Sequence, residues 1–167
     1  MTSLPAVSAA RFRDGMASLA AGISIVTTSG PAGHAGFTAS GICSVTDQPP
    51  TLLVCMNRGV SSYPEFIGNG HLAVNVLAAG QHDLSNRFAD KDLSRTERFA
   101  STHWQPMANG CLRLTDSLVS FGCRVSLTQD VGTHCVFYCV VEEIIRNEAP
   151  RDALVWFARR YHSTTIG

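Results

Sequence analysis

Small hydroxyl and amide side chains gather near the ends of several strand-like segments. They are Thr38, Ser40, Ser44, Thr46, Asn57, Ser61 and Ser62. Hydroxyl groups, a carboxamide and exposed backbone N–H groups can bind a phosphorylated ligand without any net charge. The same residue types are also common in turns, because their side chains bond to the nearby backbone. The residues alone therefore leave ligand binding and ordinary turn formation both open.

Motifs for several other kinds of chemistry are missing from the sequence. The spacing of Gly30, Gly33 and Gly36 is not that of a dinucleotide-binding loop, and no phosphate-binding loop ends in Gly-Lys-Ser or Gly-Lys-Thr. There is no Gly-x-Ser-x-Gly and no His-Glu-x-x-His, and the six histidines lack metal-ligand spacing. The six cysteines form no Cys-x-x-Cys pair, so we expect reduced thiols that pack as small apolar side chains. We therefore predict no metal site and no hydrolase.

Composition narrows the class of protein further. The chain has 167 residues, 45% hydrophobic and 16% charged, which predicts a single folded domain over residues 1–167. Thirteen basic and thirteen acidic residues cancel, which argues against nucleic-acid and membrane partners. No apolar run spans a membrane and no signal-peptide stretch opens the chain, so we expect a cytoplasmic protein. The low charged fraction predicts that a partner chain covers some apolar surface.

The elements that position these residues are mostly strands. Apolar residues at helical spacing predict a helix over Ala9–Ala20, with Phe12, Met16 and Leu19 on one face. Further short helices are expected within Ser61–Gly70 and Gln81–Ala100. Seven charges between Arg87 and Arg98 are interpreted as a solvated face. Strands are predicted over Ile23–Thr28, Gly36–Val45, Leu52–Met56, His71–Leu77, Val119–Leu127, Cys135–Ile145 and Leu154–Phe157.

Two of these strands define the fold class. Val119–Leu127 alternates apolar and small or polar residues over nine positions, which is typical of a half-buried antiparallel strand. The nearly continuous apolar run Cys135–Ile145 suggests burial on both faces, with a core on one side and a partner subunit on the other. Five to seven strands without regular strand–helix alternation favour a closed antiparallel barrel with added helices.

The order of motifs resembles one known family. Gly36-Phe37-Thr38-Ala39-Ser40, Cys43-Ser44-Val45-Thr46 and Pro49-Pro50 resemble the signature of the flavin reductase-like family. The further motifs are Cys55-Met56-Asn57 with Ser61, Asn75-Val76-Leu77, Arg87-Phe88, Gly132-Thr133-His134 and Trp156-Phe157 to Tyr161-His162. The similarity runs from about Arg11 to His162. Within the family, the reductases of pyrimidine-degrading, 4-hydroxyphenylacetate and chlorophenol monooxygenases look particularly similar.

The resemblance implies a mainly β, split β-barrel homodimer with a few peripheral helices and a flavin near the subunit interface. It implies an NAD(P)H:flavin oxidoreductase that transfers hydride from NADH or NADPH to FMN or FAD. The reduced flavin would then diffuse to an oxygenase component. Carried over residue by residue, His134 would face the nicotinamide. The flavin would contact Thr38, Ala39, Ser40, Ser44, Val45, Cys55, Asn57, Ser61, Ser62, Asn75, Arg87, Phe88 and Tyr161.

Two alternatives stay open at this stage. One is a split-barrel oxidase that holds FMN permanently as a prosthetic group. The other is a non-enzymatic module that binds flavin or haem. Because hydride transfer needs alignment of two cofactor rings rather than acid–base groups, the absence of acid–base motifs agrees with the reductase interpretation. Gly41 departs from the Ala or Ser more usual in the family, which leaves the contacts to the flavin ring open.

Overall fold

The computed structural model describes residues 6–100, 102–149 and 151–166, so residues 1–5, 101, 150 and 167 of the predicted domain lie outside this description. Its main sheet has seven antiparallel strands in the order β3-β2-β6-β9-β10-β5-β4. Their bounds are β2 Ser24–Thr28, β3 Ala35–Ala39, β4 Ile42–Asp47, β5 Pro50–Asn57, β6 His71–Val76, β9 Val119–Val131 and β10 His134–Arg146. The prediction of a mainly β fold is confirmed.

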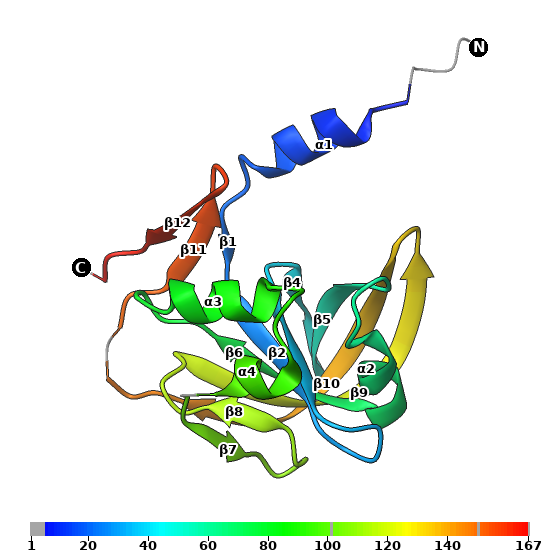
Figure 1. Cartoon of the computed structure of the whole chain (residues 1–167), viewed down its shortest axis with the longest axis vertical. Coiled ribbons are helices and arrows are strands. Elements are labelled where there is room, and N and C mark those ends of the chain that lie inside the picture. Colours follow the sequence, from blue (N-terminus) through cyan, green and yellow to red (C-terminus); the bar gives the residue numbers. More distant parts are fainter. Residues whose placement is uncertain (1–5, 101, 150, 167) are drawn as a thin grey trace.

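The two edges of this sheet are consecutive in the chain. Only Ser40 and Gly41 separate β3 from β4, so the sheet curls until its edges approach each other (Figure 1). The backbone N–H of Cys55 on β5 donates to the carbonyl of Gly41 at 2.9 Å, which extends the pairing of β5 with β4 by one residue into the link from β3. Within the curl lies an apolar core that includes Val26, Phe37 and Phe137.

Most short strands outside the main sheet were missed by the sequence patterns. β1 Ala21–Gly22 and β12 Arg160–Ser163 flank β11 Leu154–Phe157, and β7 Trp104–Pro106 pairs with β8 Leu112–Leu114. The count of five to seven strands is therefore too low, because such short elements usually carry too little periodicity to be recognised. Only β11 among them was predicted, over the same residues. The small three-stranded sheet packs on a second core, which includes Ile25, Leu77 and Leu154.

The helices are short and peripheral. They are α1 Ala9–Met16, α2 Tyr63–Asn69, α3 His82–Ala89 and α4 Arg95–Phe99. The first helix ends four residues earlier than expected, and none of its residues is buried. Figure 1 shows α1 standing away from the barrel. Its apolar residues therefore do not join the core, contrary to the amphipathic pattern.

The long β9–β10 hairpin carries the clearest sequence signal. Along β10, the buried residues Cys135, Phe137 and Cys139 alternate with half-exposed Val136 and Tyr138. In the single chain one face of β10 enters the core, as predicted, and burial of the other face against a partner subunit stays a prediction. Among the described residues, no helix is both long and apolar enough to cross a membrane.

Candidate functional site

One cavity gathers several of the predicted flavin contacts. We call it the α3 cavity; its volume is about 580 Å³, and it lies between β3, the end of β5 and α3. Its lining residues are Phe37, Thr38, Asn57, Gly59, Val60, Ser61, Phe88, Ala89, Lys91 and Arg98. Four residues expected at the flavin therefore line one cavity, although they come from separate segments of the sequence.

The hydroxyl of Thr38 is held in a fixed orientation at this cavity. Its Oγ1 donates to the carbonyl of Ser85 on α3 at 2.6 Å. Because that proton is already committed, the oxygen presents lone pairs and acts as an acceptor for further partners. Asn57 is fixed in a similar way, since its Oδ1 accepts the backbone N–H of Gly59 at 2.8 Å.

Arg98 is the charged group that sequence reasoning missed. The residue is 7% exposed, and one guanidinium nitrogen donates to the carbonyl of Asp90 at 2.6 Å. The Nε of Arg98 is buried without a hydrogen-bond partner among the described residues. A buried, unpaired N–H on a cation is costly unless an anion meets it. The interpretation of residues 87–98 as a solvated face is wrong at this position.

Two further features make the cavity suitable for an anion. Lys91 also lines it, so two cations face the same space. Ser62, at the start of α2, is 3% exposed, and its Oγ has no hydrogen-bond partner within the described part of the chain. Neighbouring Ser61 lines the cavity directly. The donor set of cations and hydroxyls is the one that a phosphate group requires.

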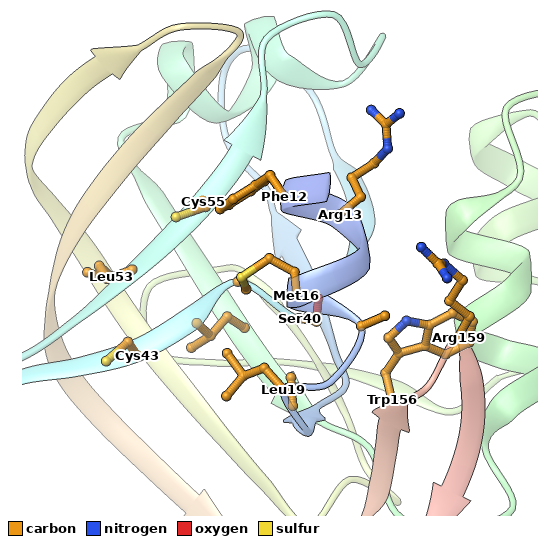
Figure 2. A pocket seen from close by; sticks show the side chains of 14 residues that line it. Phe12, Arg13, Met16, Leu19, Ser40, Cys43, Leu53, Cys55, Trp156 and Arg159 are labelled. Carbon is orange, nitrogen blue, oxygen red and sulfur yellow. The ribbon is translucent and has the colours of Figure 1, made fainter. Parts of the chain in front are cut away.

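A second cavity opens beside the first. We call it the α1 cavity; its volume is about 530 Å³, and α1 and the β11–β12 hairpin form its walls (Figure 2). Ser40 and Cys55 line it, while Asn57 lines the α3 cavity. Because Cys55 and Asn57 are two residues apart on β5, their side chains point to the same face of the sheet. The two cavities therefore follow one another along this face.

Cys55 forms part of the wall of the α1 cavity. Burial raises the pKa of the Cys55 thiol, and the nearby Cys43 thiol raises it further. The thiol is thus protonated at neutral pH and is a poor nucleophile. A Cβ placed on Gly41 would lie 3.1 Å from the Cβ of Cys55, which gives a physical reason for glycine at this position.

Other predicted contacts lie outside both cavities. Ala39 points into the barrel core, Ser44 lines a third hollow of about 380 Å³, and Val45 is exposed nearby on β4. Tyr161 bonds to α3, where its hydroxyl lies 3.0 Å from Ser85 Oγ and 2.8 Å from Asn86 Oδ1.

The structure does not bring Asn75 or Arg87 to either cavity. Asn75 is fully buried, and its side chain bonds to backbone and side-chain groups from β2, β8 and β9. Arg87 donates instead to the carbonyl of Ala100 at 2.7 Å. Both residues therefore stabilise the surroundings of the site.

His134 begins β10 and is not among the residues that line either cavity. It is paired in register with Asn57, which brings the two side chains next to each other on adjacent strands. Its Nδ1 lies 2.9 Å from the hydroxyl of Thr133, and the ring is exposed. The left-handed backbone of Gly132, with φ of 56°, makes the tight turn that precedes it.

Comparison with known proteins gives consistent results. The model of the flavin reductase like domain family matches residues 16–165. The chain is 55% identical over 152 residues to the FMN reductase (NADH) RutF of Enterobacter sp. (strain 638), covering 91% of this chain and 92% of that protein. The same protein of Escherichia coli (strain K12) is 53% identical over the same length, with the same coverage.

Solved structures agree with the sequence comparison. A protein from Haemophilus somnus 129PT has a TM-score of 0.90 and 46% identity, covering 95% of this chain and all of that one. The styrene monooxygenase flavin reductase of Pseudomonas putida S12 has a TM-score of 0.83 and 25% identity, covering 93% and 98%. The similarity in both comparisons extends over nearly the whole chain.

Proposed function

The chain belongs to the flavin reductase-like domain family, and we propose that it reduces free FMN with NADH and releases the reduced flavin to an oxygenase. It is an oxidoreductase of the flavin reductase type, as its relatives are. The relatives named FMN reductase (NADH) support FMN and NADH over FAD and NADPH. The observation that carries the proposal is the buried guanidinium of Arg98 at a cavity lined by hydroxyl groups.

The residues of the α3 cavity fit a flavin mononucleotide. Arg98 and Lys91 would bind its phosphate, because a dianion balances two cations and meets the unpaired Nε. Ser61 adds a neutral group at the same end, and Asn57 lies further along β5 towards the ring. Thr38, with its proton committed to Ser85, would accept a hydrogen bond from a ribityl hydroxyl. The ring would extend along the sheet face towards Ser40 and Cys55.

The protein residues align the reactants, while the flavin supplies the redox chemistry by accepting a hydride from the nicotinamide. Hydride transfer requires the two rings to stack at a short, fixed distance. The neutral thiol of Cys55 would form an uncharged wall for the rings. His134 would position the nicotinamide at the rim beside Asn57.

The role of His134 can be tested on its own. His134→Ala should raise the KM for NADH and slow flavin reduction, with FMN affinity little changed. A loss of about ten- to hundredfold in kcat/KM corresponds to about 1.4–2.7 kcal/mol of transition-state stabilisation. Stopped-flow reduction at the wild-type rate over a range of NADH concentrations would show that His134 is only a turn residue.

We also propose that two copies of the chain form a homodimer in the cytoplasm. The α1 helix, the edge strand β4 and the β9–β10 hairpin expose large apolar side chains. The most exposed include Phe12 at 61%, Leu127 at 59%, Val131 at 56% and Ile144 at 55%. Such a surface is unusual for a monomer and favours an interface. Sedimentation equilibrium at micromolar concentration should give twice the mass of one chain, and a single-chain mass would refute the dimer.

The decisive experiment for the function is steady-state oxidation of NADH and NADPH with added FMN, FAD or riboflavin. We expect turnover of many equivalents of free FMN, with NADH as the better donor. Flavin that stays bound through gel filtration, without turnover of added FMN, would instead indicate a prosthetic-group oxidase. Flavin binding without any oxidation of nicotinamide would indicate a non-enzymatic module. Either result would overturn the proposal.

A further inference from the structure

The α1 cavity has a mixture of surfaces that the flavin site does not explain. Its walls are largely apolar and include Phe12, Met16 and the indole of Trp156 (Figure 2). Among the described residues that line it, the only charged ones are Arg13 on α1 and Arg159 on the β11–β12 hairpin. An apolar wall with an aromatic ring and two guanidinium groups suits a ligand that combines a flat base with an anionic group.

Arg159 reaches this cavity through an unusual turn. The turn that joins β11 to β12 consists of Ala158 and Arg159, whose φ angles are 50° and 60°. Residues with a Cβ adopt this left-handed conformation at an energetic cost, and such conformations concentrate at functional sites. The backbone N–H of Ala158 donates to the carbonyl of Ala17 at 2.8 Å, which ties the turn to the segment after α1.

The two arginines are available to an anion. Arg159 pairs with Asp14, but the side chains of this pair are 60% and 67% exposed, so the pair is weak in water. Arg13 has no ion-pair partner among the described residues. Each guanidinium carries five N–H donors, and the single bond recorded between Arg159 and Asp14 leaves most of them free.

We infer that Arg13 and Arg159 bind the pyrophosphate of the nicotinamide dinucleotide, which makes them determinants of affinity for NADH. This inference rests on the proposed function. Because Lys91 and Arg98 in the α3 cavity account for the flavin phosphate, a second phosphorylated substrate needs a second set of cations. The α1 cavity supplies them, and its lining also includes Cys55, about 7 Å along β5 from Asn57. The two rings would meet at this Cys55 wall.

The test compares each arginine with a neighbouring arginine that does not line the cavity. Arg13→Gln and Arg159→Gln should each raise the Kd and the KM for NADH about fivefold, the scale of one partly exposed ionic hydrogen bond. The kcat and the KM for FMN should be unchanged. The matched controls are Arg11→Gln on the same helix and Arg160→Gln beside the turn, and both should behave like the wild type.

Binding is measured without turnover by energy transfer from tryptophan to NADH in protein free of flavin. Trp156 lies in the cavity, and the chain has only two tryptophans, so Trp156→Phe should remove most of the signal. Asp14 on α1 pairs with Arg159, so Asp14→Asn removes the ion pair that anchors α1 and leaves both arginines in place. This variant therefore distinguishes binding of phosphate from anchoring of α1. If the arginines bind phosphate, this variant should keep or improve NADH affinity, because a nearby negative charge is lost.

Three results would overturn the inference. The first is a rise in the KM for FMN rather than NADH in the arginine variants. The second is a loss of NADH affinity in Asp14→Asn that matches the loss in Arg159→Gln, which would show that only the anchoring of α1 matters. The third is unchanged NADH affinity in both arginine variants. A failure of the proposed function would look different from a failure of this inference. The wild type would then not oxidise NADH with FMN, while the fluorescence titration would still show whether NADH binds in the α1 cavity.

Discussion

Replacement of Arg98 by methionine tests the phosphate end of the site, because methionine keeps much of the side-chain length and removes the charge. Arg98 is 7% exposed, and its Nε has no hydrogen-bond partner among the described residues. A charge-assisted hydrogen bond is worth about 1.5–3 kcal/mol. The Kd for FMN should therefore rise about ten- to one hundred and fiftyfold. The maximal rate at saturating FMN should change little, since Arg98 does not contact the reacting rings.

The assay is quenching of FMN fluorescence on binding, repeated with riboflavin, which has no phosphate. Riboflavin should bind the wild type and the variant with similar affinity. Arg87→Met is the matched control, because Arg87 bonds to the carbonyl of Ala100 outside the cavity and should change FMN affinity less than about threefold. Thermal melts of both variants measure how much stability is lost when Arg98 no longer donates to the carbonyl of Asp90. Equal loss of riboflavin and FMN affinity in Arg98→Met would refute the phosphate assignment.

Three further predictions concern stability and the walls of the site. Gly36→Ala should destabilise the fold by about 1–3 kcal/mol in urea unfolding and weaken FMN binding, because a Cβ there would lie 2.7 Å from the ring of Phe88. Tyr161→Phe removes the hydroxyl contacts to α3 and should cost about 1–3 kcal/mol by the same measurement, with a smaller effect on kcat. Burial raises the pKa of Cys139 from 9.0 to about 12, so thiols ionise first in the unfolded chain and the melting temperature should fall as pH rises above about 9. Cys139→Val should reduce this pH dependence, and an unchanged slope would contradict the reasoning.

The local sequence determined the strands whose pattern is long enough to read. The alternation over Val119–Leu127 and the apolar run over Cys135–Ile145 both lie in the hairpin that the structure contains. Leu154–Phe157 matches β11 at both ends. The series of motifs from Gly36 to His162 identified the family, since each motif extends over a few consecutive residues. These features depend on neighbours in the chain, which a sequence displays directly.

Packing between segments far apart in the chain sets which polar residues face a cavity. Arg87 and Arg98 lie in one charged segment, yet packing of α4 buries the second and leaves the first bonded to a loop carbonyl. Asn75 looks like a ligand contact by its motif, but three strands enclose it. The direction of the Arg159 side chain depends on a hairpin turn whose two left-handed residues are Ala158 and Arg159. Because neither is a glycine, the sequence gives no sign of this turn. Each outcome depends on contacts between segments far apart in the chain, and a local pattern holds no information about which segments meet.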